Sequence, residues 1–288
     1  MAISSGRADV DGLGEVVGVL REWQHDDAPL QLHPGDLGWF WRFGAEATAA
    51  AVRTWRRHGR IVAVGLLDGP TVLRLTSAPD AQRDEELTHR LVEDLDRPER
   101  GVLPPAEVNV EAPTNSLLPG LLSAAGWKVD EPWTPLRRDL REPVEDPGVR
   151  VEVVGPEQAA AWAAVLRASF DGSTFAAQRW HAMAAGSPYA QARSLLAYDG
   201  RGAAVGVATV WSAGPGRPGL LEPVGVHRDH RGRGHGRAVS VAAAAALQEL
   251  SSSSAEVCTP SANAGAVATY RSAGFRALDQ RWDRRRPA

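Results

Sequence analysis

The sequence has little cysteine, no long apolar run and no large excess of charge of either sign. Its single cysteine, Cys258, excludes an internal disulfide and is typical of a reducing compartment. No apolar run approaches the roughly 20 residues that span a bilayer. Acidic residues at positions 9, 11 and 15 stand where an export signal would need an apolar core. We therefore expect a cytoplasmic protein with no membrane partner.

The overall balance of residues narrows the function further. The formal net charge is -3, with 43% hydrophobic and 23% charged residues, which is ordinary globular composition. This mild acidity argues against a nucleic-acid partner, because such proteins are usually basic. No histidine, cysteine or carboxylate spacing is typical of a metal site, so we expect no metal. The 288 residues are enough for two domains, each with its own core.

The most informative stretch is 220–250. An apolar run, 220–226, leads through a turn rich in glycine and arginine into an alanine-rich segment, 238–250, which we predict to be a helix. The first N–H groups of a helix lack partners within it, and the helix dipole makes that end positive. Gly232, Gly234 and Gly236 have no Cβ, so a phosphate could approach the backbone closely. Arg231, Arg233 and Arg237 would add mobile positive charge. The pattern predicts a diphosphate-binding turn.

Two common phosphate-binding motifs are absent from this turn: a Walker A Gly-Lys-Ser/Thr, and the acidic residue that follows a Rossmann glycine motif. The motif present, Arg-x-x-Gly-x-Gly at 231–236, resembles the acetyl-CoA pyrophosphate loop of the GCN5-related N-acetyltransferase (GNAT) superfamily. A second stretch agrees with this resemblance. A short apolar strand, 255–259, precedes a segment that opens with Asn263, carries Tyr270 and ends in Gly274-Phe275. Both motifs in this order make residues 150–283 similar to a GNAT domain.

The resemblance implies an acetyl-CoA site in the second half of the chain. A backbone N–H of the central strand near Val226 would polarise the thioester carbonyl, and Tyr270 matches the general acid that protonates the departing sulfur. Asn263 matches a polar group beside the pantetheine, although an N-cap role is also open. The residues expected to bind the cofactor are Val224, Gly225, Val226, Arg231, Gly232, Arg233, Gly234, His235, Gly236, Arg237 and Asn263.

Glu222 is the candidate general base. It is a carboxylate in an otherwise apolar strand, and period-two alternation would place it on the same face as Val224 and Val226. An acid that only bonds to a neighbouring strand, or a water relay in place of a protein base, remains an open alternative. Tyr270 could likewise be a core residue.

The first half resembles the second after a shift of about 148 residues. Segment 115–126 then overlies 263–274, and 79–91 overlies 228–239. We predict two tandem α/β domains of the GNAT type, 1–141 and 149–288, each with a mixed, mostly antiparallel sheet flanked by helices. Glu85 and Leu87 replace Gly234 and Gly236, and Leu122 replaces Tyr270. The first copy should therefore neither bind the cofactor nor catalyse, because carboxylates at that helix start repel a diphosphate.

Local patterns give the expected elements. The helices are expected at 11–24, 44–57, 80–95, 115–126, 157–169, 176–185, 238–250 and 263–274, and an aromatic cluster at 39–43 should belong to the core. The strands are expected at 60–67, 70–77, 107–110, 193–198, 203–211, 220–226 and 255–259. A linker rich in proline and charge occupies 141–148.

The acceptor is the least defined part. The resemblance implies a primary amine on a small molecule, and an aromatic rim with one acid would suit a cationic one. That rim comprises Phe170, Asp171, Phe175, Trp180, His181 and Tyr189, unless these aromatics only pack helix on sheet. Three alternatives remain: acetylation of a thiol-sugar amine, as in the tandem mycothiol synthases, a non-catalytic acyl-CoA-binding module, and an RNA-binding protein using 228–237. A monomer or a homodimer is equally compatible with the sequence.

Overall fold

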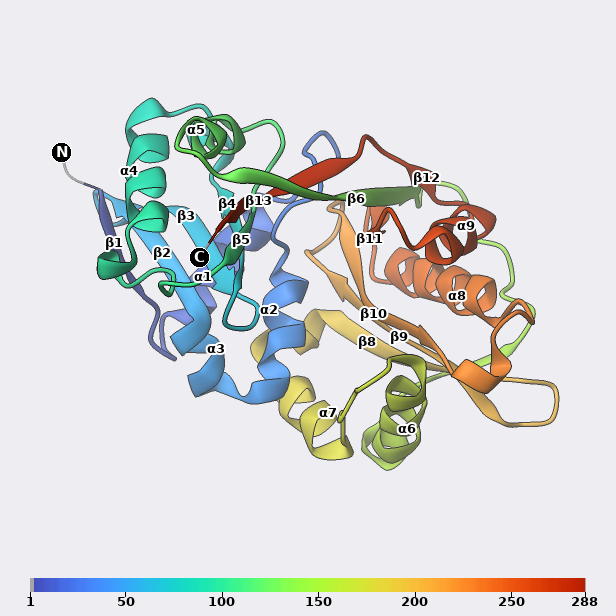
Figure 1. Cartoon of the computed structure of the whole chain (residues 1–288). Helices are drawn as coiled ribbons and strands as arrows, with labels where there is room; N and C mark the ends of the chain where they lie inside the picture. Colours follow the sequence, from blue (N-terminus) through green and yellow to red (C-terminus); the bar gives the residue numbers. More distant parts are fainter. Residues whose placement is uncertain (1–2, 288) are drawn as a thin grey trace.

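The computed structural model describes residues 3–287 and contains two halves with a similar succession of elements (Figure 1). The first half runs β1 (Ser4–Arg7), α1 (Leu13–Glu22), α2 (Pro34–Phe40), α3 (Ala45–Ala51), β2 (Val52–Arg57), β3 (Arg60–Leu67), β4 (Val72–Ser77), α4 (Glu85–Asp96), β5 (Val108–Glu111), α5 (Leu118–Ala124) and β6 (Lys128–Asp139). The second runs β7 (Arg150–Val153), α6 (Ala159–Ser169), α7 (Ala177–Ala184), β8 (Ala192–Tyr198), β9 (Ala204–Ser212), β10 (Gly219–Val226), α8 (His235–Glu249), β11 (Ser254–Pro260), α9 (Ala264–Ser272), β12 (Arg276–Ala277) and β13 (Arg281–Arg286).

The strands join into one continuous, mostly antiparallel sheet. Its order is β1-β2-β3-β4-β5-β13-β6-β11-β10-β9-β8-β7, with β12 paired to β6 at the side. The parallel pairs are β4 with β5 and β10 with β11. The expected mixed α/β fold, a mostly antiparallel sheet flanked by helices, is therefore confirmed.

The two halves exchange strands where they meet. β13, from the second half, pairs with β5 of the first, and the later part of β6, from the first half, pairs with β11 of the second. Figure 1 shows β6 and β13 running together across the junction. A buried ion pair between Arg281 on β13 and Glu111 on β5, 2.7 Å apart, reinforces this exchange. The sheet of each half is thus completed by the other.

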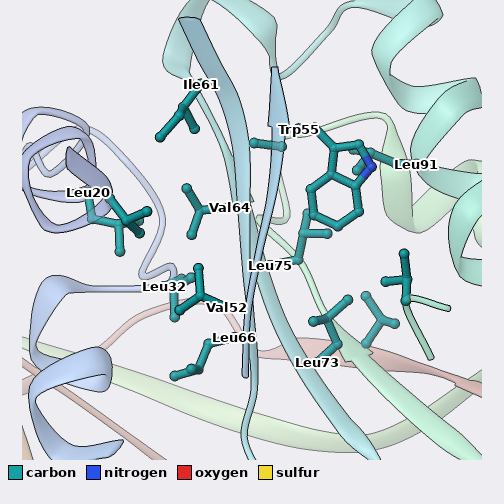
Figure 2. Close-up of a cluster of buried hydrophobic side chains, with 14 of the residues drawn as sticks. Leu20, Leu32, Val52, Trp55, Ile61, Val64, Leu66, Leu73, Leu75 and Leu91 are labelled. Atoms are coloured by element: carbon teal, nitrogen blue, oxygen red, sulfur yellow. The ribbon is translucent and has the colours of Figure 1, made fainter. Parts of the chain in front are cut away.

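Each half nevertheless has its own hydrophobic core. In the first half Leu20 and Leu32 lie on one side of the sheet, while Trp55 and Leu91 lie on the other (Figure 2). The Trp55 indole donates a 2.8 Å hydrogen bond to Asp94. In the second half, alternate residues of the strands face opposite sides. One face packs against α8 and α9, and the other packs against α6 and α7.

Two local predictions were wrong, and one long strand was missed. The helix expected at 44–57 ends at Ala51, and Val52–Arg57 forms β2, since its valine, threonine and tryptophan favour a strand. The helix expected from residue 115 begins at Leu118. The long strand β6 was not predicted, because Pro132 and Pro135 interrupt its pattern. Within residues 3–287, no helix has both the length and the apolar composition needed to cross a bilayer.

Candidate active site

The turn before α8 leaves the start of that helix open. Gly232 and Gly234 adopt φ angles of 74° and 84°, which a side chain would strain, and Gly234 is the N-cap. No side chain bonds to the first turn of α8, and that turn carries no acidic residue. Its N–H groups are therefore available to an anionic ligand.

A cavity of about 460 Å³ lies beside this turn. Eight of the residues expected to bind the cofactor line it, namely Val224, Gly225, Val226, Arg231, Gly232, His235, Gly236 and Asn263. Arg233, Gly234 and Arg237 lie outside its lining. Arg231 donates to the Ser169 carbonyl at 2.6 Å, and Arg237 donates to the Ser272 carbonyl at 3.0 Å.

The central strand β10 separates from β11 along this cavity. The two pair only at Gly219 with Ala255 and at Leu220 with Glu256. The register between β10 and β9 shifts between Leu221 and Val224. The 224–226 segment therefore has an edge that β11 does not occupy, and an extended ligand could hydrogen-bond there as an added strand would. Because of the shift, simple alternation does not hold from Glu222 to Val226.

A second cavity, of about 650 Å³, lies between the two halves. It shares Phe170, Val224, Asn263, Ala266 and Tyr270 with the first cavity. Tyr270 on α9 is only 8% exposed, and burial raises the pKa of its phenol above the ordinary value, so the hydroxyl keeps its proton at neutral pH. Asn263 caps α9 by accepting a hydrogen bond from the Ala266 N–H at 3.1 Å. The two cavities thus meet at a protonated phenol.

Glu222 lines the second cavity and meets the first half of the chain. Its Oε2 lies 3.3 Å from Nη1 of Arg74 on β4. Burial is the largest influence on Glu222 and raises its pKa to about 7, while Arg74 opposes this shift and the Asp36 carboxyl reinforces it. A carboxyl group with this pKa can exchange a proton near neutral pH.

The first half supplies functional side chains that sequence reasoning missed. Arg74 pairs with Asp36 on α2 and lies 3.6 Å from Glu111 on β5. Both acids line the second cavity, as does Arg281 from the exchanged strand. The signal for Arg74 was present in the sequence, since it precedes Glu222 by 148 residues, which is the offset of the predicted repeat.

The expected acceptor-side residues divide into two groups. Phe170 and Phe175 line the second cavity. Trp180 and Tyr189 instead pack and donate hydrogen bonds to the Ser194 hydroxyl, at 3.1 and 3.0 Å. The exposed Asp171 pairs with Arg228, 3.3 Å away. His181 lies edge-on to Trp180, outside the cavity lining. Two of the six residues, Trp180 and Tyr189, therefore hold helix to sheet, as the packing alternative expected. Among residues 3–287, no three His, Cys, Asp or Glu side chains are grouped to hold a metal ion.

Comparison with known proteins defines the class of this domain. Residues 161–275 match the family described as the Acetyltransferase (GNAT) family. This part of the chain is therefore a GNAT acetyltransferase domain, that is, an acyltransferase. No curated protein is significantly similar in sequence.

Solved structures share the whole fold at low identity. A GCN5-related N-acetyltransferase from Sphaerobacter thermophilus is 19% identical, with a TM-score of 0.60, covering 99% of this chain and 95% of that one. A tandem GNAT protein from the clavulanic acid biosynthesis pathway is 16% identical, with a TM-score of 0.58 and coverage of 99% and 98%. A GNAT-family acetyltransferase from Colwellia psychrerythraea is 15% identical, with a TM-score of 0.58 and coverage of 99% of both chains. At these identities the likeness is one of fold.

Proposed function

We propose that the protein is an N-acetyltransferase that moves an acetyl group from acetyl-CoA to a primary amine of a small molecule. The observation that carries this proposal is the meeting of two cavities at Tyr270 and Val224, one beside an open helix start and one between the halves. A donor and an acceptor must approach a common point for direct transfer, and these cavities offer one such point.

The first cavity suits the donor. The pyrophosphate would lie at the start of α8, where free N–H groups and the helix dipole favour negative charge. The pantetheine would extend along the unpaired edge of 224–226. A backbone N–H of that segment would then stabilise the oxyanion that forms when the thioester is attacked.

The second cavity suits the amine, and two side chains there provide acid–base chemistry. Glu222 would accept a proton from the attacking ammonium group, whose nitrogen then bonds to the thioester carbon. The carbon–sulfur bond breaks as the tetrahedral intermediate collapses. Tyr270 would give its proton to the departing sulfur, so that free CoA leaves as a thiol. The nitrogen would lose its second proton as the amide forms, and that proton would restore the Tyr270 phenol.

The first half, 1–141, would then be a degenerate copy that supports the catalytic half, 149–288, without binding acetyl-CoA. Its α4 begins with its own cap, since Asp84 accepts a 2.9 Å hydrogen bond from the Leu87 N–H. Glu85 and Glu86 follow in the first turn. Three carboxylates at this helix start oppose a diphosphate. This half would contribute to the reaction by forming one wall of the second cavity and by placing Arg74 in it.

Calorimetric titration with acetyl-CoA, followed by a free-thiol assay with mixed small amines, tests the proposal. We expect one donor site per chain and amine-dependent release of CoA. Two sites would refute the degenerate first copy. Binding without thiol release for any amine would favour the acyl-CoA-binding module, and no binding would refute the acetyltransferase.

A further inference from the structure

Two arginines in the acceptor cavity have no acidic partner. Arg42, in the short 3-10 helix Trp41–Phe43, and Arg179, on α7, both line the cavity. Among residues 3–287, neither guanidinium has a carboxylate oxygen within 4 Å, in contrast to Arg74 and Arg281 in the same cavity. The cavity therefore presents four arginines and three carboxylates, with the excess positive charge on Arg42 and Arg179.

Arg42 belongs to the first half of the protein and Arg179 to the second. Their guanidinium groups both lie near the ring of Phe43. The Cζ of Arg42 is 4.4 Å from the ring centre of Phe43, and the Cζ of Arg179 is 5.4 Å from it. Arg42 also stacks over Trp39, at 4.2 Å, and donates one hydrogen bond to the Trp39 carbonyl, at 2.7 Å. Stacking uses the face of a guanidinium and leaves N–H groups at its edge for a further acceptor.

The Arg42 side chain is only partly exposed to water, which disfavours its charge. Burial lowers the pKa of Arg42 to about 10, the more distant carboxylates of Asp68 and Glu222 oppose this shift, and Arg179 makes a smaller contribution that lowers the pKa further. Cations that are partly removed from water, and close to one another, are stabilised when an anion joins them. A carboxylate matches the flat, forked donor geometry of arginine.

We propose that Arg42 and Arg179 bind a carboxylate of the acceptor, so that the substrate is an amino acid or a similar amine that also carries a carboxylate. The amine would lie at Glu222 and Tyr270, and the carboxylate at the arginine pair. This inference rests on the proposed acetyltransferase function. It narrows the expected cationic acceptor, for which an aminoglycoside, an amino acid and a polyamine were equally suitable, to an amine that also carries a carboxylate.

Conjugates that join CoA to a model acceptor test the inference. In each, the CoA sulfur carries an acetyl linker whose carbonyl is amide-bonded to an ω-amino acid, from glycine to aminohexanoate. A matched series ends in a neutral carboxamide. The CoA portion anchors every conjugate in the donor site, so each pair differs only in the charge at its far end.

For at least one chain length, we expect the wild-type protein to bind the carboxylate about tenfold or more tightly than the carboxamide. Arg42→Gln and Arg179→Gln should each weaken this preference, and the double variant should lose it. The matched control is Arg201→Gln, at an exposed arginine in the turn between β8 and β9, which should keep it. Calorimetry gives each dissociation constant, and unchanged affinity for free CoA shows that each variant is folded.

Three results overturn the inference, and they are distinguishable. Normal affinity for CoA without a carboxylate preference at any length refutes the arginine subsite alone, as does a preference that survives in the double variant. Failure of the wild-type protein to bind CoA and all the conjugates refutes the acetyltransferase function, and the inference with it.

Discussion

The starts of α4 and α8 show how one position in a fold can be closed or open to a ligand. Helix α4 has Asp84 as its N-cap, with an internal hydrogen bond, and Arg57 holds the carboxylates of Asp84 and Glu86. Helix α8 has Gly234 as its N-cap, without a side-chain bond. Acidic side chains of the protein compensate the positive end of the α4 dipole. No such side chain lies at the start of α8, so an anionic ligand could compensate its dipole. By helix position, Asp84 rather than Glu85 stands opposite Gly234.

The ends of α5 and α9 are alike in backbone but not in chemistry. Gly126 and Gly274 follow these helices with φ angles of 95° and 83°. The next residue in each case, Trp127 or Phe275, donates its N–H to the carbonyl of Leu122 or Tyr270, both at 3.1 Å. Leu122 and Tyr270 are therefore structurally equivalent and both buried, but Tyr270 alone carries an acidic proton.

The largest expected effect on activity comes from removing the Tyr270 hydroxyl. Tyr270→Phe keeps the ring that packs against Phe275, with 5.8 Å between ring centres, and loses the hydroxyl. We expect kcat to fall by about 10²–10⁴-fold while the affinity for acetyl-CoA stays unchanged. Steady-state kinetics and calorimetry measure both. Tyr189→Phe, a tyrosine outside the acceptor cavity, is the control. Unchanged kcat in Tyr270→Phe would show that another group protonates the sulfur.

The next largest expected effect is on acetyl-CoA affinity, and it comes from placing an acidic residue at the N-cap of α8. Gly234→Glu adds a carboxylate and strains a backbone with a φ angle of 84°. We expect the dissociation constant for acetyl-CoA to rise roughly tenfold to a hundredfold. Gly234→Asn tolerates positive φ without charge and should lose less affinity. If neither variant weakens binding, the donor does not use this turn.

A smaller effect concerns the pair formed by Arg74 and Glu222. With a pKa of about 7, Glu222 is protonated below neutral pH and becomes a base above it, so kcat/KM should rise with pH through about 7. Arg74 lowers this pKa, so Arg74→Gln should move the rise to higher pH. Glu222→Gln should abolish it, whereas Glu249→Gln, at an exposed site, should not. A profile insensitive to Glu222→Gln would indicate a water relay.

The smallest effect comes from opening α4. Asp84→Ala removes the cap, and we expect unfolding to require about 1 kcal/mol less free energy. It should not create a second acetyl-CoA site, because Leu87 and the remaining acids still occupy the turn. Chemical denaturation and calorimetric stoichiometry report these outcomes. Glu85→Ala, at an exposed acid, is the control for stability. A second acetyl-CoA site in Asp84→Ala would mean that the Asp84 cap alone prevents the first half from binding acetyl-CoA.

Local signals in the sequence were sufficient for two helices beside the first cavity. The alanine-rich run of α8 and the Gly-Phe ending of α9 depend on residues close in sequence, and the structure contains both helices, although α8 begins at His235 and not at residue 238. The hairpin at Asp68-Gly69 was likewise predicted from residues close in sequence. Each of these features follows from propensity and turn chemistry alone.

The acceptor side could not be predicted, because it depends on contacts between distant parts of the chain. The pKa of Glu222 follows from burial and from Asp36 and Arg74 in the other half. The unpaired state of Arg42 and Arg179 follows from which acids happen to lie nearby. Period-two alternation on β10 also failed at its shift in register, which no residue type signals uniquely.

The strand exchange has a consequence for synthesis on the ribosome. Arg281 on β13 pairs with Glu111 on β5, 170 residues earlier. The sheet of the first half therefore has an unfilled edge throughout translation of the second, and such edges invite aggregation. Completion of the first half's sheet must wait for the second half, and we expect the finished protein to lose both halves in a single unfolding transition.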